Sequence, residues 1–559
     1  MKKIVILIVI NIISSYINIT YSNDSEKLKT LVDLYSKEIN QITTLDYYIK
    51  YEKLLNDIEY KNLTIDEEKI NYSIIKWEID LGKKSLAFSS NYIPFNQHRN
   101  YQKNIKIYVQ NPNNFRSERE YSNYLKLLSK YYDWIEKSIE NFKLGIQNNI
   151  VLPKIIVEEM ILQFDIKDFN NIEKNEFYLP LTYFSDDISL SFKNDISEKI
   201  NTFIANDVFN KQKKMYDFLV YEYLPKAQLK VGITNLPDGN AWYEFLIKKY
   251  TSTDLTSNEI HKIGLNEIAR IKKEMIELKN KMKFKGNFNE FLIYLNTIKS
   301  KKYENSESIL DEINLINETI NKNIFSCFNE VPKSKLEIKR TEAYREQTAN
   351  PEYIDGNFKK SISGIFYFPI KDYTNFTSIY NESVFLHEAI PGHHYQISLI
   401  QENNTIPEFR KNLWYEFYGE GWAFYAESLG TNLGLYTDDL QYFGKLENDM
   451  HRALRLVIDT GIHTKNWTFD EAVNYSLQYE IKNKSEIETE IKKYIAIPGL
   501  ALSYKMGELK IKELKSYSIE HLKDKFSIKE FHHEILSSGQ MPLEVLETKI
   551  KNWVDKYPK

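Results

Sequence analysis

The chain has 559 residues, of which 42% are hydrophobic and 14% aromatic, so it has ample apolar material for a large core and is neither disordered nor fibrous. Its 74 basic and 78 acidic residues leave a net charge of -4, which gives no electrostatic case for a nucleic-acid partner or an anionic membrane surface. The single cysteine, Cys327, excludes a disulfide within the chain and a cysteine-based zinc site, and we expect it to be a small buried hydrophobic residue.

Residues 1–22 have the pattern of a secretory signal peptide. Lys2 and Lys3 form a basic start, an apolar run follows over residues 4–13, and Thr20-Tyr21-Ser22 places small residues where a signal peptidase reads. The alternative is an uncleaved membrane anchor, but the apolar run is shorter than the ~20 residues that span a bilayer. No cysteine near the cleavage point offers a lipid anchor, and no later segment predicts a membrane span. We therefore expect an exported protein, periplasmic or extracellular, without a stable membrane anchor.

Most of the remaining chain shows the periodicity of helices, with only 18 Gly and 14 Pro in total. Two long examples are Glu259–Met282 and Ile309–Ile324; in the second, isoleucines recur at three- and four-residue steps. Four helix starts are indicated by capping boxes, in which a hydroxyl precedes a carboxylate by three residues: Thr64/Glu67, Thr256/Glu259, Thr468/Glu471 and Ser527/Glu530. The sequence thus predicts a mostly α fold.

Gly364–Phe368 departs from this pattern, because it is short, β-branched and aromatic between Gly364 and Pro369, and we expect a strand there. Turns are indicated at 236–239 and 497–499 by Pro and Gly. The first of these suggests a boundary within one domain of residues 23–559, with a helical lobe up to about residue 235 and a catalytic lobe over 236–559.

The segment His387-Glu388-Ala389-Ile390-Pro391-Gly392-His393-His394 places three histidines beside a glutamate. In the common zincin motif two histidines four residues apart bind one zinc ion from the same face of a helix, and the glutamate between them activates water. Here the fourth position is Pro391, and on a regular helix His394 would lie ~10 Å further along the axis, out of reach of a shared ion. Pro391 and Gly392 permit a break that would return His393 to the usual place. We therefore expect His387 and His393 as ligands, with His394 as the alternative ligand or a substrate contact.

A catalytic zinc site usually has three protein ligands, and Glu420 is the best candidate for the third. It lies 27 residues after His393, enough for a loop and a returning helix. Glu427 follows seven residues later, on nearly the same helical face, and could orient a ligating histidine.

These segments resemble a bacterial family catalogued as domain of unknown function 885. The resemblance rests on five blocks: 387–396 (HExxPGHHxQ), 420–427 (EGWAxYxE), 452–463 (RAxRLVxDTGxH), 498–505 (PGxAxSYK) and 539–543 (GxMPL). The family is similar to the helical zincins around thimet oligopeptidase. The resemblance implies a two-lobed helical zincin-like metallopeptidase fold with a small β-sheet beside the active-site cleft, and it supports Glu420 as a ligand. The Gly364–Phe368 strand would be the edge of that sheet, able to hold an extended peptide. In one block the chain has Lys493 and Leu500 where the family pattern would have Arg and Gln.

We therefore expect a secreted zinc-dependent metallopeptidase of oligopeptides. Zn²⁺ would lie on His387, His393 and Glu420, and Glu388 would be the general base. By analogy with the oligopeptidases, Tyr504 is the first choice for the group that stabilises the oxyanion. Further candidates for the site are His463 and Tyr494 as alternative donors and Arg455 for a substrate carboxylate.

Two other functions stay open on the sequence. One is a zinc amidase that acts on non-peptide or cell-wall amides. The other is an exported binding protein that keeps the fold without turnover, although retention of Glu388 argues against it. The sequence indicates no oligomeric state.

Overall fold

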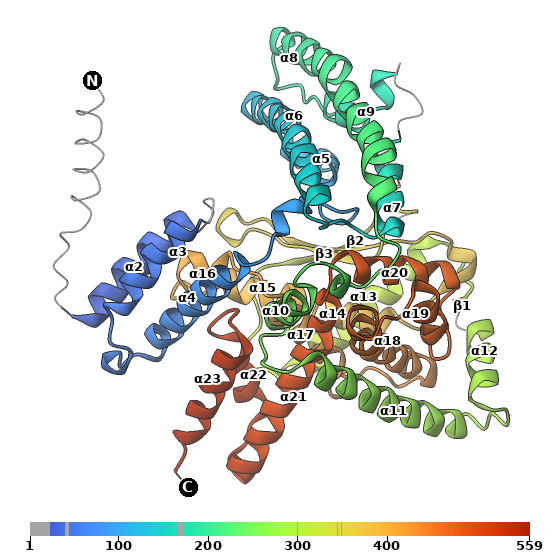
Figure 1. Cartoon of the computed structure of the whole chain (residues 1–559). Coiled ribbons are helices and arrows are strands. Elements are labelled where there is room, and N and C mark those ends of the chain that lie inside the picture. Colours follow the sequence, from blue (N-terminus) through green and yellow to red (C-terminus); the bar gives the residue numbers. More distant parts are fainter. Residues whose placement is uncertain are drawn as a thin grey trace.

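The computed structural model describes residues 23–558 apart from 40–43, 166–170, 299, 344 and 348, and this part of the chain is mostly helical, as predicted (Figure 1). The predicted signal peptide, residues 1–22, lies outside the described residues. Of the helices in the described ranges, none combines the length and the apolar character needed to cross a bilayer. Cys327 is buried, as expected for a small hydrophobic residue.

The first three described helices pack against the C-terminal part of the chain, at the left of Figure 1. They are α2 (Asp24–Glu38), α3 (Leu45–Asn56) and α4 (Asp66–Ser85). One buried apolar cluster joins Leu31, Tyr51 and Ile74 of these helices to residues far along the chain, such as Phe409 and Ile550. This N-terminal segment therefore shares one apolar core with the C-terminal part of the chain.

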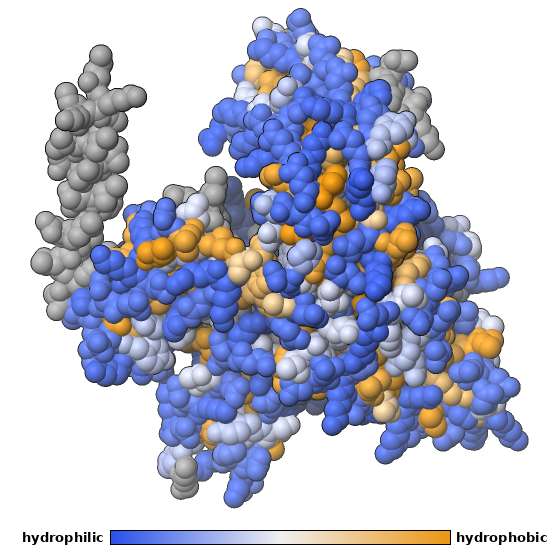
Figure 2. Space-filling model, in the orientation of Figure 1, coloured by the Kyte–Doolittle hydropathy of each residue, from blue (hydrophilic) through white to orange (hydrophobic). Residues whose placement is uncertain are grey.

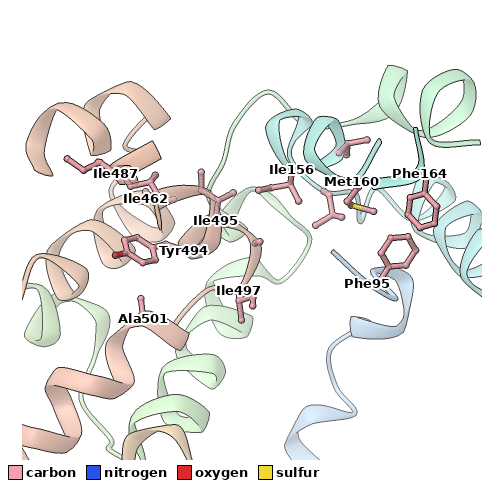
Figure 3. Close-up of a cluster of buried hydrophobic side chains, with 14 of the residues drawn as sticks. Phe95, Ile156, Met160, Phe164, Ile462, Ile487, Tyr494, Ile495, Ile497 and Ala501 are labelled. Atoms are coloured by element: carbon pink, nitrogen blue, oxygen red, sulfur yellow. The ribbon is translucent and has the colours of Figure 1, made fainter. Parts of the chain in front are cut away.

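The next helices form an arm that projects from the body, at the top of Figure 1. They are α5 (Tyr101–Val109), α6 (Glu118–Gln147), α7 (Lys154–Phe164), α8 (Leu190–Phe203) and α9 (Phe209–Asp217). The visible face of the arm is mostly hydrophilic, with apolar residues gathered between its helices and towards its base (Figure 2). At the base, Ile156 and Met160 of α7 face Ile495 and Ile497 of the C-terminal part, within one buried cluster (Figure 3).

The body consists of long helices whose apolar faces give it a continuous core. Its first helices are α10 (Gly239–Thr251), α11 (Ser257–Lys281), α12 (Phe288–Ile298) and α13 (Ser306–Asn323). Those nearest the motif are α14 (Asn381–Glu388), α15 (His393–Glu402), α16 (Glu408–Lys411) and α17 (Glu416–Glu427). The last are α18 (Asp439–Thr464), α19 (Phe469–Ser476), α20 (Lys484–Ala496), α21 (Ser503–Leu522), α22 (Ile528–Leu536) and α23 (Leu543–Asp555). Both long helices expected from periodicity are present, as α11 and α13.

Capping chemistry explains where several of these helices begin. Complete capping boxes are formed at Thr256 and Thr468, as predicted, and Ser527 accepts the N–H of Glu530. The predicted box at Thr64 is wrong: Ile65 is the N-cap of α4, and no side chain caps it.

Helices α17 and α21 cross at very short distance because glycines meet at the crossing point. A Cβ built on Gly421 would lie 2.6 Å from the Cα of Gly507, closer than any side chain allows. Glu420 precedes the first glycine and Tyr504 lies one turn before the second, so this crossing brings both residues to the same region of the body.

A small sheet lies beside α14 and corrects one expectation. Its strands are β2 (Leu336–Arg340), β3 (Glu352–Ile354) and β4 (Gly364–Phe368), in the order β2-β4-β3, and a separate pair is formed by β1 (Ser300–Lys301) and β5 (Phe376–Thr377). The strand predicted at Gly364–Phe368 is confirmed as β4, but it is the central strand, parallel to β2 and antiparallel to β3. It was expected to be the edge strand, and that expectation is wrong because both of its sides are paired. Phe366 of β4 packs edge-on against Phe385, which fixes α14 beneath the sheet.

Candidate metal centre

The histidine motif lies at a break between two helices, as predicted. α14 ends at Glu388, α15 begins at His393, and the Ile390–Pro391 peptide bond between them is cis. A side chain at Gly392 would overlap the carbonyl oxygens of residues 386 and 387, so only glycine fits where the chain folds back. From α17, the indole N–H of Trp422 donates to the carbonyl of Pro391 at 2.8 Å and holds the break in place.

The break brings both histidines to one carboxylate on α17. Glu420 Oε2 lies 3.3 Å from His387 Nε2 and 3.5 Å from His393 Nε2, and the two rings are 4.9 Å apart between centroids. Donor atoms bound tetrahedrally to zinc at ~2.1 Å would be about 3.4 Å apart. Both distances from Glu420 therefore match the separation between ligand atoms of a tetrahedral zinc ion.

Glu388 offers a second carboxylate at the same place. Ligand atoms of His387, Glu388 and His393 all lie within 4.8 Å of one another, so these three residues could also hold a metal ion. Glu388 Oε2, however, accepts the backbone N–H of Tyr353 in β3 at 3.1 Å. Because Glu420 contacts both histidines whereas Glu388 is held by a strand, Glu420 is the better third ligand and Glu388 remains available as a base.

Glu427, expected from its spacing to orient a ligating histidine, contacts the first histidine of the motif. Its Oε1 lies 2.9 Å from His387 Nδ1. When Nδ1 donates its proton to this carboxylate, the lone pair on Nε2 faces Glu420, which is the tautomer that a metal ligand needs. Glu427 is itself fully buried, so the interaction is shielded from water.

The charges around these residues favour a cation. Burial alone would lower the pKa of His387, but hydrogen bonds to Glu420 and Glu427 outweigh it and raise the pKa to about 10. Burial also raises the pKa of Glu388, against the attraction of the two histidines. Among the described residues, no Lys or Arg forms an ion pair with Glu388, Glu420 or Glu427. The raised pKa means that a proton on His387 balances part of the negative charge of Glu388, Glu420 and Glu427.

Tyr504 is brought to the centre from α21. Its ring stacks on His387 with 6.5 Å between centroids and an angle of 14°. Burial and nearby Glu420 raise its pKa, so the hydroxyl keeps its proton. A ring that stacks on His387 and carries a protonated hydroxyl suits the part of an oxyanion donor.

His394 points away from the two ligand candidates. Its Nδ1 lies 3.1 Å from the hydroxyl of Tyr353, and burial lowers its pKa to about 4. Because the backbone of Tyr353 holds Glu388, His394 supports the strand residue that positions this carboxylate. This geometry favours His393 over His394 as the partner of His387.

The other three candidates interact mainly with the chain itself. Both ring nitrogens of His463 are engaged, at 3.1 Å each, by the N–H of Ile233 and the carbonyl of Tyr494, so it has no free donor. Arg455 packs over the Tyr504 ring at 4.5 Å but pairs with Glu490 at 3.1 Å and bonds the Tyr494 hydroxyl at 3.3 Å. We therefore leave His463, Arg455 and Tyr494 out of the set that would act on a substrate.

A cavity of about 410 Å³ opens beside His387 and Glu388. Two residues at this cavity were not predicted from the sequence as site residues: one lines the cavity, and the other contacts Glu388. Tyr353 acts through its backbone, which no residue-type pattern reveals. Arg452 lines the cavity together with Asn448 and Lys482, and the only signal for it in the sequence is its place at the start of the block 452–463.

One comparison with known proteins identifies the family, and another shows the fold. Residues 20–550 match the model of the family described as bacterial protein of unknown function (DUF885). A crystal structure of a candidate lipoprotein from Colwellia psychrerythraea is similar over 96% of this chain and 100% of that one, with a TM-score of 0.85 and 24% identity. A candidate lipoprotein of unknown function from Shewanella oneidensis covers 93% and 96%, with a TM-score of 0.63 and 16% identity. No protein of curated function matches the chain.

Proposed function

The chain belongs to the bacterial family of unknown function DUF885, and we propose that it is an exported zinc-dependent metallopeptidase that hydrolyses peptide bonds in oligopeptides. The observation that carries the proposal is the position of Glu420, within 3.5 Å of the Nε2 atoms of both His387 and His393. A separate glutamate, Glu388, lies beside them and is held from the other side by a strand. Three ligands and one independent carboxylate are what hydrolysis at a zinc site needs.

Each residue has a distinct part in the proposed reaction. His387, His393 and Glu420 would hold the ion, and Glu427 keeps His387 in the ligating tautomer. Zinc, when bound, acts as a Lewis acid that lowers the pKa of water and stabilises negative charge on oxygen. Glu388 takes the proton of the attacking water and passes it to the leaving amine.

Two further groups would shape the transition state. The Tyr504 hydroxyl donates a hydrogen bond to the carbonyl oxygen as charge develops on it, and its raised pKa keeps the donor protonated. The Tyr353 N–H fixes the Glu388 carboxylate at 3.1 Å, so the base does not have to reorganise. This N–H points away from β4, so the edge of β3 that is not paired with β4 faces the site. That edge could hold an extended substrate. The sequence had assigned this role to the Gly364–Phe368 strand.

The likeness to helical zincins around thimet oligopeptidase supports the same function. In those enzymes a glutamate follows the His-Glu motif at the spacing seen for Glu420, and a second follows seven residues later, as Glu427 does. Export is proposed from the signal-peptide pattern of residues 1–22, in accord with two structural neighbours described as candidate lipoproteins.

Zinc analysis and a peptide-library digest, with Glu388→Gln as the key variant, test this function. We expect the wild type to carry one zinc ion and to cut peptides, and the variant to keep the ion and to cut about 10²–10⁴-fold more slowly, because it lacks the base. Zinc is measured by mass spectrometry of the metal and cleavage by mass spectrometry of the peptides. Glu408→Gln, which removes an exposed carboxylate of α16, is the matched control and should change neither.

The outcomes separate the candidate functions. Zinc-free wild type, or unchanged cleavage in Glu388→Gln, would sink the proposal. Zinc-loaded protein that leaves the library intact but hydrolyses a non-peptide amide would indicate a zinc amidase. Zinc-loaded protein that binds peptides without hydrolysing any amide would indicate a binding protein.

A further inference from the structure

Arg452 lines the cavity beside His387 and Glu388 and has no acidic partner there. Throughout the described ranges, no carboxylate lies within ion-pair distance of its guanidinium. Its Nε is buried and makes no hydrogen bond. A buried donor on a guanidinium is costly to leave unpaired, so an arginine in this state points to a ligand that completes it.

The neighbouring arginine on the same helix shows the contrast. Arg455, three residues later on α18, is satisfied by Glu490 at 3.1 Å, the Tyr494 hydroxyl at 3.3 Å and His451 Nε2 at 3.3 Å. Arg452 instead packs on aromatic rings, with its Cζ 5.6 Å from the centre of Phe424 and 5.7 Å from that of Tyr504. These rings hold the guanidinium in one place without using its N–H groups.

The remaining charges of the cavity favour an anion. Two further cations, Lys371 and Lys482, line it. Among the described residues, the carboxylates that line it are Glu388, which accepts the Tyr353 N–H, and Glu427, whose Oε1 contacts His387. Lys482 pairs with Glu480 at 3.3 Å, whereas Arg452 and Lys371 form no ion pair among the described residues. The cavity therefore places His387 and Glu388 together with two cations that have no acidic partner.

We propose that Arg452 binds the free C-terminal carboxylate of the substrate, so that the enzyme removes residues from the C-terminus of peptides. The inference rests on the proposed peptidase function, whose reacting groups lie in the same cavity. A guanidinium matches a carboxylate with two parallel hydrogen bonds, and every unmodified peptide carries such a group at its end. The volume of about 410 Å³ is at the small end of the about 300–1,000 Å³ typical of ligand pockets, and so suits a chain end.

Anchoring the terminus fixes which bond is cut. With the carboxylate on Arg452, a peptide bond close to the C-terminus would lie against Glu388 and the ligand residues. Water then adds across that C–N bond: its hydroxyl becomes part of the new carboxylate on the longer fragment, and its proton goes to the amine of the released fragment. The released fragment leaves with its original carboxylate still at Arg452.

Binding and cleavage of matched peptides test the anchor. The binding probes are N-acetyl-alanyl-alanine, its C-terminal amide, and N-acetyl-glutamyl-alanine amide, which has only a side-chain carboxylate. Affinities are measured calorimetrically on zinc-treated Glu388→Gln protein, which retains Arg452 but lacks the base. We expect the free acid to bind at least about tenfold more tightly than either amide, because a charge-assisted pair is lost in both.

Variants assign that preference to Arg452. Arg452→Gln should remove it, Arg452→Lys should retain part of it, and Arg119→Gln, which removes the same charge from an exposed position of α6, should leave it intact. Thermal unfolding of each variant shows whether it is folded. If Arg452→Gln does not fold, two comparisons of acid and amide binding still test whether Arg452 is the anchor. One uses the Glu388→Gln protein that keeps Arg452, and the other uses the same protein with Arg452→Lys.

The outcomes distinguish this inference from the function on which it rests. Equal affinity for acid and amide, a preference for the side-chain carboxylate, absence of binding by all probes, or a preference that survives Arg452→Gln would overturn the anchor. Internal cleavage of free and amidated peptides alike would overturn it too, while leaving the peptidase standing. Acid-specific binding that depends on Arg452, in a protein that cuts no peptide, would support the anchor and overturn the peptidase.

Discussion

Two groups of buried charged side chains lie close together in the body, and their charges are balanced in different ways. Around Lys505, every carboxylate has a cation beside it: Asp449 at 2.6 Å, Glu267 at 2.9 Å and Glu508 at 3.0 Å all contact its Nζ. Arg270 adds further pairs, to Glu267 at 2.7 Å and to Asp449 at 2.9 Å.

Around His387 the balance is reversed, because three glutamates meet there and, within the described ranges, no Lys or Arg pairs with them. Buried charges are stable only when they are paired or bind an ion. The first group is therefore complete as it stands and joins α11, α18 and α21. The second has no Lys or Arg partner among the described residues and relies on a proton on His387, and this difference is why we propose that it binds a metal ion.

The largest effect should follow from breaking the complete group. Lys505→Met would leave three buried carboxylates short of a partner, and we expect it to lower the free energy of unfolding by about 3–5 kcal/mol. Chemical denaturation followed by circular dichroism measures the change. Lys505 is fully buried, and the carboxylates of Asp449, Glu508 and Glu267 raise its pKa although burial opposes this, so the charge is present at neutral pH.

A matched change at the proposed metal centre provides the control. Glu420→Gln in metal-free protein removes one of three carboxylates that have no Lys or Arg partner among the described residues. It should lower the free energy of unfolding by about 1 kcal/mol or less, the scale of one hydrogen bond. If this variant loses as much stability as Lys505→Met, the two groups do not differ in the way described.

The second effect concerns metal affinity and separates the adjacent histidines. His393→Ala should weaken zinc binding by more than about 100-fold, because even outer partners of a ligand are worth 10–100-fold. His394→Ala should retain nearly stoichiometric zinc, since its Nδ1 faces the Tyr353 hydroxyl and not Glu420. Metal content after dialysis, measured by mass spectrometry, gives the comparison. Zinc loss in His394→Ala with retention in His393→Ala would reverse the ligand assignment.

Short sequence patterns predicted several of the helices and strands that surround the proposed metal centre. Isoleucines at helical spacing identified α13, and residue types between Gly364 and Phe368 identified β4 to the residue. Pro391 and Gly392 indicated the break between α14 and α15 because both act on the backbone where they stand. Each of these signals is contained within a few residues of sequence.

Long-range arrangement could not be predicted in the same way. The central place of β4 depends on β2 and β3, whose pairing is not encoded within β4 itself. The contact of Tyr353 with Glu388 uses a backbone N–H, which is the same in every residue but proline. Gly507, which lets α21 approach α17 and so places Tyr504, has meaning only once its partner helix is known.

The smallest effect should come from Asp459, a buried carboxylate that forms no ion pair with any of the described residues. It accepts hydrogen bonds from the Tyr243 hydroxyl at 2.5 Å and the Gly499 N–H at 3.1 Å. Burial raises its pKa to about 7 although both hydrogen bonds act in the opposite direction. In the unfolded chain the pKa of an aspartate is about 3.9. Between these values the folded protein holds a proton that the unfolded chain lacks.

The stability that this proton provides is complete below about pH 4 and is lost as the pH rises through 7, since stability falls with pH wherever the folded state binds more protons. Asp459→Asn removes the titration while keeping an acceptor for Tyr243 and Gly499. The wild type should therefore lose about 2 kcal/mol relative to the variant between pH 5 and pH 7, measured by urea unfolding at each pH. A pH-independent difference would mean that Asp459 stays charged, although no cation pairs with it among the described residues. The expected dependence of stability on pH would show that a bound proton neutralises Asp459. This differs from the group around Lys505, where a cation neutralises the carboxylates, and from Glu420, where we propose a metal ion.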